Sequence, residues 1–79
     1  MNEELRLVEV EWVAAHRIAG DVWESRDDAE PMDPLPVKSV GYLVEESDSH
    51  VTLTHSFTAD QFACRFCIPA GCITETRWL

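Results

Sequence analysis

The sequence predicts an all-β protein, a small barrel of five short, strongly bent strands. Apolar and polar residues alternate along several short runs, and turn-forming residues separate these runs. A flat sheet of five strands would leave one apolar face in water, so we expect the strands to close into a barrel. The chain has 79 residues, a length that supports one small core, and we assign residues 1–79 to a single domain.

The first strand is predicted at residues 8–12, where Val8, Val10 and Trp12 alternate with glutamates. Residues 14–36 follow, a segment too long for a hairpin turn and without alternation. We expect it to form a long acidic loop between the first and second strands, with residues 24–30 as a candidate for a short helix. Trp23, together with Val22, is expected to anchor this loop to the barrel.

The second strand is predicted at residues 37–46 and contains Gly41, which would permit a sharp bend or the close approach of another backbone. Period-two alternation predicts the third and fourth strands. Asp and Ser in the two intervening segments satisfy turn backbone locally. The remaining elements are the strands at 51–57, 62–68 and 72–78, the loops at 47–49 and 58–60, and a tight helical turn at Pro69-Ala70-Gly71.

Composition narrows the classes of partner. Fifteen acidic residues stand against six basic ones, a formal net charge of −9, whereas binding to a phosphate backbone relies on Lys and Arg. RNA or DNA binding is therefore not expected. No apolar run approaches the roughly 20 residues of a membrane span. Three cysteines and the lack of a secretion-type leader favour a reducing, cytoplasmic setting.

Two stretches carry a resemblance to a known family. Residues 41–53, GYLVEESDSHVTL, and residues 66–74, FCIPAGCIT, resemble the two-part signature of Sm-like proteins. Together with Trp12-x-x-Ala15-His16, the string also resembles small uncharacterised proteins of bacteriophages and prophages. The resemblance implies a five-stranded barrel that assembles into rings, in which the fourth strand of one subunit pairs with the fifth strand of the next.

The family's RNA contacts are not implied for this chain. Asp48 has no matching Asn in its turn, and Pro69-Ala70-Gly71 stands where the family carries a basic pair. The long acidic loop has no counterpart in short family members. Functions other than RNA binding therefore have to be considered.

Catalytic and metal sites are the less favoured interpretations. Cys64, Cys67 and Cys72 with His50 and His55 supply zinc-type ligands, but residues 64 and 67 would point to opposite faces of an unbroken strand. No base is fixed beside a particular thiol, as a cysteine nucleophile requires. His55 falls on the apolar phase of its strand and is expected in the core, whereas His50 is expected to be exposed. We therefore expect no cofactor and no enzymatic activity.

Three functions remain open. The first is a phage or prophage accessory protein that forms a homo-oligomeric ring and binds a host or phage protein or a small ligand. The second is an acidic mimic of nucleic acid that inhibits a host protein, and the third is a sponge for a nucleotide-like molecule. The residues assigned to the subunit contact are Phe62, Cys64, Phe66, Ile68, Ile73 and Trp78, and those assigned to a partner or ligand are Trp23, Asp27, Asp28, Arg65, Gly71 and Arg77.

Overall fold

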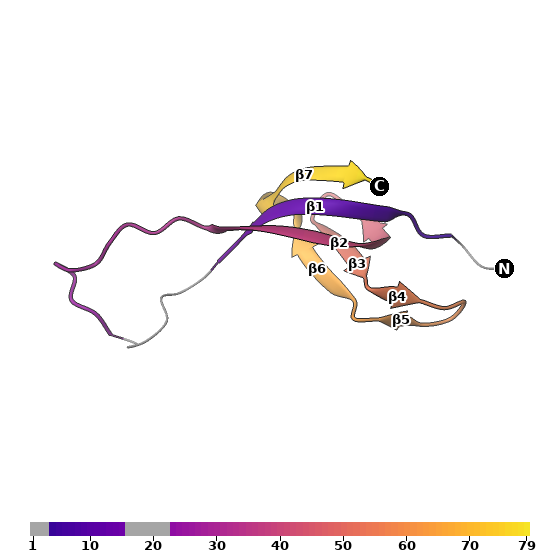
Figure 1. Ribbon diagram of the computed structural model, residues 1–79, viewed down its shortest axis with the longest axis horizontal. Coiled ribbons are helices and arrows are strands. Elements are labelled where there is room, and N and C mark those ends of the chain that lie inside the picture. Colours follow the sequence, from indigo (N-terminus) through magenta and orange to yellow (C-terminus); the bar gives the residue numbers. More distant parts are fainter. Residues whose placement is uncertain (1–3, 16–22) are drawn as a thin grey trace.

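A computed structural model describes residues 4–15 and 23–79, and within these residues the chain forms strands and one 3₁₀ turn (Figure 1). The predictions that concern His16 and Val22 lie outside the described residues. The all-β prediction is confirmed for the described part. The elements are β1 (Leu7–Ala14), β2 (Leu35–Glu46), β3 (His50–Thr54), β4 (Ser56–Phe57), β5 (Phe62–Ala63), β6 (Phe66–Pro69), η1 (Ala70–Cys72) and β7 (Ile73–Trp78).

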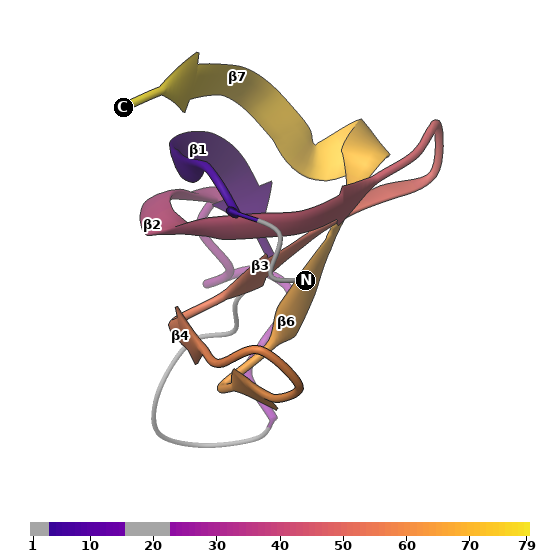
Figure 2. The same cartoon turned by 90° about the vertical axis from the view of Figure 1, so that its right-hand side faces the viewer.

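Five strands form one antiparallel sheet in the order β6-β3-β2-β1-β7, and β4 and β5 form a separate two-stranded sheet. The prediction of a closed barrel is not met, because β6 and β7 lie at opposite edges of the sheet. The turn η1 joins these two edges, and β6 and β7 leave it in different directions (Figure 2). The sheet is thus bent but open.

The core lies on the concave face of the bent sheet. It consists of five buried aliphatic side chains from β1, β3 and β6, with three partly buried residues packed against them. The alternation of β1 is confirmed, because the residues at 8 and 10 are buried whereas Glu9 is only partly covered. The buried residues are Val8, Val10, Val51, Leu53 and Ile68, and those packed against them are Trp12, Leu43 and Ile73.

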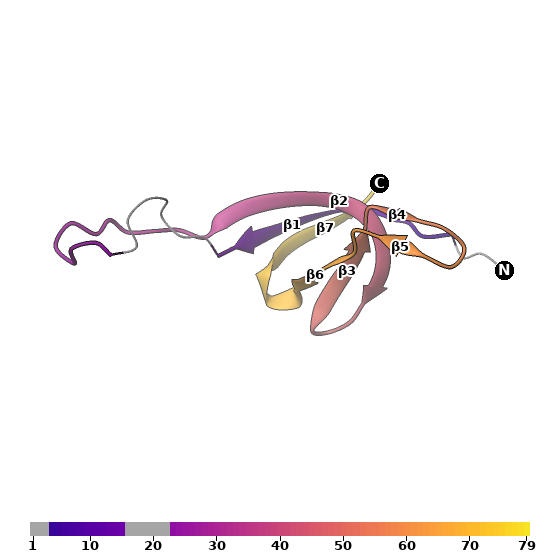
Figure 3. The same cartoon turned by 90° about the horizontal axis from the view of Figure 1, so that it is seen from below.

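Gly41 in β2 lies close to β3, which is one of the two roles that the sequence offers for this glycine. The strand β2 runs for 12 residues and arches over the rest of the sheet (Figure 3). A Cβ atom at position 41 would lie 3.1 Å from the carbonyl oxygen of Thr54 and 3.2 Å from the Cβ of Leu53. The backbones of β2 and β3 therefore approach so closely here that a side chain at position 41 would require its neighbours to shift.

The predicted third and fourth strands are each interrupted once, at the same level of the fold. Leu53 lies opposite Phe66 and Ser56 lies opposite Ala63, so the pairing register is continuous across the interruption. Cys64 adopts φ 56°, a left-handed conformation that ends the ladder. The β4–β5 hairpin therefore leaves the sheet at an angle as a short ribbon.

Thr54 stabilises this kink. Its side chain is fully buried, and its hydroxyl lies 2.7 Å from the carbonyl oxygen of Ala63 and 2.9 Å from that of Ser56. Thr52 is also buried. Thr52 and Thr54 are thus covered, whereas Ser56, the next residue in the same alternation, is exposed.

The acidic loop differs from its prediction in two respects. Residues 24–30 form a turn at Arg26–Asp28 rather than a helix, with the amide of Asp28 donating to the carbonyl oxygen of Ser25 at 3.2 Å. Trp23 is 88% exposed, so the expectation that it anchors the loop to the sheet is wrong. Residues 23–34, which we call the acidic arm, extend away from the sheet (Figure 1) and contribute to overall dimensions of 60 × 22 × 20 Å. An arm rich in carboxylates and prolines has few apolar groups with which to fold back.

Candidate functional site

The edge strand β7 has backbone groups that face away from the sheet. The amide of Leu79 donates to the carbonyl oxygen of Leu7 at 3.1 Å, which fixes the direction of its hydrogen bonds toward β1. Backbone direction alternates along an antiparallel strand, so the amides of Thr76 and Trp78 point to the free edge. This edge can therefore accept another strand.

The other edge strand, β6, is constrained by a proline. The amide of Ala70 donates to the carbonyl oxygen of Ser49 at 2.9 Å, toward β3. By the same alternation, the backbone groups of Pro69 and Cys67 face outward. Pro69 thus lacks its N–H on the free side, the one place where an edge strand tolerates proline.

The six residues assigned to a subunit contact are distributed over three strands and the break between β5 and β6. Phe66 on β6 is 39% exposed and Trp78 on β7 is 48% exposed, so both free edges carry an accessible aromatic ring. Ile68 belongs to the buried core, and Ile73 is half-buried against it. Phe62 lies on β5 and Cys64 in the break, outside the edge of the main sheet.

The residues assigned to partner or ligand contact do not converge in one chain. Arg77 lies on the convex face of β7, where its guanidinium pairs with Glu9 at 3.2 Å and Glu75 at 3.0 Å. Gly71 in η1 borders open space, with no atom within 4 Å of a Cβ placed there. Asp27 and Asp28 lie in the exposed turn of the acidic arm, remote from the sheet.

Charges on the convex face are arranged in pairs across strands. The Lys38 ammonium lies 3.2 Å from the Glu11 carboxylate and, as its largest influence, lowers the pKa of that carboxyl. On the other face of the sheet, where Trp78 lies opposite the buried Val8, the Arg6 guanidinium is 4.3 Å from the ring centroid of Trp78. These contacts use cations that a nucleic-acid site would need free.

A polar cluster that the sequence did not reveal closes the β2–β3 turn. The Nδ1 of His50 lies 2.9 Å from the Ser49 hydroxyl and 3.3 Å from the Ser47 hydroxyl, and its Nε2 lies 3.1 Å from the Glu45 carboxylate. This hydrogen bond to His50 is the main cause that lowers the pKa of Glu45. His50 is half-buried rather than exposed, and its position five residues after Glu45, across a short hairpin turn, was the available signal.

His55 is exposed, so its assignment to the core is wrong. It occupies the kink between β3 and β4, where the strand phase no longer directs it inward, and its Nδ1 lies 2.7 Å from the Ser56 hydroxyl.

The break between β5 and β6 likewise separates Cys64 from Cys67, so the opposite-face argument against a shared site does not hold. In the ranges 4–15 and 23–79, the three cysteines are free thiols and no three His, Cys, Asp or Glu side chains gather as metal ligands do.

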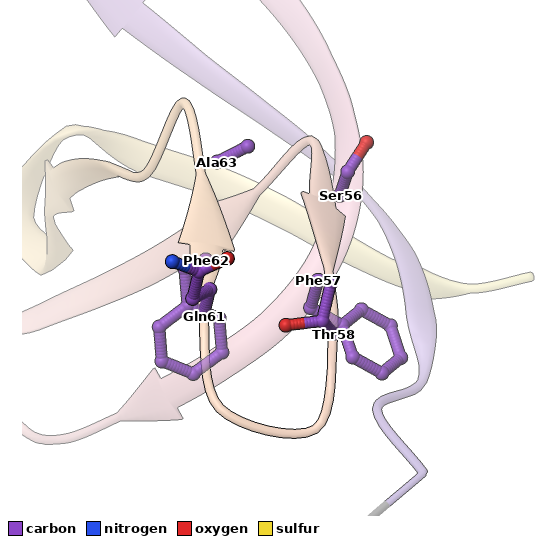
Figure 4. Close-up of a pocket in the computed structure, with 6 residues that line it drawn as sticks. All are labelled: Ser56, Phe57, Thr58, Gln61, Phe62 and Ala63. Atoms are coloured by element: carbon purple, nitrogen blue, oxygen red, sulfur yellow. The ribbon is translucent and has the colours of Figure 1, made fainter.

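The β4–β5 hairpin borders an open cleft of about 370 Å³ whose lining includes two phenylalanines (Figure 4). Phe57 and Phe62 lie directly opposite each other in the pairing register. The Phe57 ring packs edge-on against Tyr42 at a centroid distance of 5.0 Å, and the Phe62 ring lies 5.8 Å from the Arg65 guanidinium. The cleft is lined by Ser56, Phe57, Thr58, Gln61, Phe62 and Ala63.

Comparisons of the chain with protein-family models, with curated proteins and with solved structures gave no significant match. Among the described residues, no helix has the length and apolar character needed to cross a bilayer.

Proposed function

We propose that this chain is a non-enzymatic accessory protein of phage or prophage type that assembles through its two free edges into an Sm-like homo-oligomer in the cytoplasm. The observation that carries the proposal is the strand order, which among the described residues leaves the outer edges of β6 and β7 without a partner strand. These are the fourth and fifth predicted strands, which the Sm-like resemblance expects to pair between subunits.

Physical arguments support edge pairing. Natural proteins either block an exposed strand edge or use it, and β7 carries an exposed tryptophan with no proline. A head-to-tail contact between two different edges generates a closed ring when the rotation closes. The small core of five buried aliphatic residues would also gain from burial between subunits.

The assembly is tested by removing one outward N–H. Thr76→Pro deletes an amide that faces the free edge of β7 but spares the hydrogen bonds to β1, whereas Thr76→Val keeps the amide and serves as the matched control. We expect wild type and Thr76→Val to elute as an oligomer in chromatography with light scattering, and Thr76→Pro to elute as a 9.0 kDa monomer with near-native circular dichroism. A monomeric wild type, or a Thr76→Pro oligomer of unchanged mass, would contradict the proposal.

A second candidate, binding of a basic protein partner through the acidic arm, is favoured by the exposure of Trp23. Trp23 is 88% exposed in a segment that also carries Asp27 and Asp28, and a large aromatic side chain of this kind can supply binding energy when a partner buries it. Such binding would serve either an assembled accessory protein or an inhibitor that mimics nucleic acid.

Pull-down from host lysate with wild type and with Trp23→Ala tests the arm. Partners held by charge should be released at high salt and should be reduced in the Trp23→Ala sample. Partners retained unchanged at high salt would argue against mimicry.

A further inference from the structure

The free edge of β7 has a pattern of side chains that is complementary to itself. Arg77 and Glu75 lie on the convex face, opposite glutamates of β1, and Thr76 lies between them on the concave face, opposite Val10. The side chains of Arg77 and Glu75 are 52% and 53% exposed, so both charges are accessible. Among the described residues β1 is the only strand beside β7, and Figures 1 and 2 show no other described segment along its outer side.

The backbone of this edge fits an antiparallel partner. The outward N–H and C=O groups belong to alternate residues, among them Thr76 and Trp78, and β7 contains no proline. A second copy related by a two-fold axis through Thr76, perpendicular to the sheet, presents the same groups in reverse order. Thr76 then exchanges two hydrogen bonds with Thr76 of the second copy. The two sheets join into one antiparallel sheet with both concave faces on the same side.

The charges select the register of this pair. With the axis at Thr76, Arg77 of each copy lies opposite Glu75 of the other. These are non-hydrogen-bonded positions, where opposed Cβ atoms are closest, about 4.5–5.5 Å apart. An axis at Glu75 or at Arg77 would instead place two like charges opposite each other. Of these three registers, the one centred on Thr76 pairs opposite charges, and by symmetry it does so twice.

Trp78 supplies the apolar part of the contact. Its side chain is 48% exposed on the concave face, opposite Val8 and 4.3 Å from the Arg6 guanidinium. In the dimer each Trp78 lies diagonal to Thr76 of the second copy, within reach of its side chain. Exposed ion pairs contribute little to affinity, so backbone hydrogen bonds and the tryptophans supply the attraction while the charges fix the register.

We propose that β7 pairs with β7 of a second copy in a symmetric antiparallel dimer centred on Thr76. The inference rests on the proposed assembly through free strand edges, which requires the same edge for β6 of another copy. A copy in the symmetric dimer cannot accept β6 at β7. The dimer therefore regulates the proposed assembly, because it withholds the β7 edge until the two copies separate.

Two charge reversals test the register. Glu75→Arg leaves two arginines on the edge and Arg77→Glu leaves two glutamates, so each variant alone places like charges opposite each other. We expect each to dimerise about tenfold more weakly than wild type in sedimentation equilibrium. An equimolar mixture should recover the wild-type dimer affinity, because every arginine then lies opposite a glutamate.

The matched controls change net charge by the same amounts away from β7. Glu46→Arg lies on β2 and Arg26→Glu lies in the acidic arm. Neither should show the tenfold weakening, and their mixture should bind no more tightly than either variant alone. Because Arg77→Glu also loses the pair with Glu9, circular dichroism checks that this variant is folded.

Hydrogen exchange of the wild type gives a second measurement, which requires no variant. As the dimer forms with rising concentration, the outward amide of Thr76 should become protected, whereas the outward amide of Cys67 on β6 should not. Pairing of β6 with β7 would protect both amides.

The inference is overturned if the mixture does not recover the affinity, or if Cys67 is protected together with Thr76 in the dimer. Either result would leave β6 as the partner of β7, as in the proposed assembly. A symmetric dimer that never grows into a larger oligomer as concentration rises would support the inference and contradict the ring alone.

Discussion

At the scale of single residues, the two described glycines, Gly41 and Gly71, test whether the close approach of β2 and β3 requires a glycine. Gly41→Ala would place a Cβ within 3.2 Å of two β3 atoms, one of them a backbone oxygen, so we expect unfolding free energy to fall by about 1–3 kcal/mol. Gly71→Ala meets no atom within 4 Å and should change stability little. Urea denaturation of both variants measures the two changes in the free energy of unfolding. If both variants lost the same free energy of unfolding, the close approach of β3 would not be the reason that position 41 requires glycine.

The His50–Glu45 contact predicts a pH dependence. The hydrogen bond from His50 lowers the pKa of Glu45 below its ordinary value of 4.5, so the unfolded chain binds a proton to this carboxyl more readily than the folded chain does. Its stabilising contribution is therefore complete above pH 4.5 and is lost as the pH falls further through the lowered pKa.

Glu45→Gln removes this titration, so its melting temperature should fall less steeply than that of wild type between about pH 5 and pH 3. Glu46→Gln, one residue along the same strand and exposed, is the control and should follow wild type. Parallel curves for Glu45→Gln and wild type would show that the contact contributes nothing in solution.

At the scale of elements, alternation predicted where the strands lie, and β1, β2, β7 and both hairpin loops agree with it within a few residues. It did not predict the break at His55 and Cys64, because the break depends on a left-handed Cys64 and on the Thr54 hydroxyl reaching Ala63 across the ribbon. Such contacts join residues that only the folded chain brings together. The Phe57–Phe62 cleft was missed for the same reason.

The acidic arm and β1 each carry a tryptophan, and the two should differ in their effect on stability. Trp23→Ala should change the free energy of unfolding by no more than about 0.5 kcal/mol, because the side chain is 88% exposed. Trp12 packs against the core and donates its indole N–H to the Ser39 hydroxyl at 3.0 Å, so Trp12→Ala should cost about 2–4 kcal/mol. Thermal melts of both variants check this. A large loss in Trp23→Ala would indicate that the arm packs on the sheet.

At the scale of the whole molecule, the sequence predicted a bent five-stranded architecture but not that the sheet stays open. Closure depends on whether the two edge strands meet, and η1 directs β6 and β7 apart (Figure 2). The local alternation of apolar and polar residues carries no information about how far apart the two edge strands lie. An open sheet with two free edges in turn makes association between copies the central question for this chain.

Net charge gives the two proposed modes of binding opposite responses to salt. Copies that each carry a charge of −9 repel one another, and salt shortens the range of that repulsion from about 30 Å at 0.01 M to about 3 Å at 1 M. Assembly through the edges of β6 and β7 should therefore strengthen as salt rises, since strand pairing and aromatic burial are not weakened by screening. Binding of a basic partner by the acidic arm should weaken over the same range. Sedimentation of the chain alone at both ionic strengths measures the first effect. An oligomer that dissociates at high salt would mean that ion pairs, rather than paired strand edges, hold the copies together.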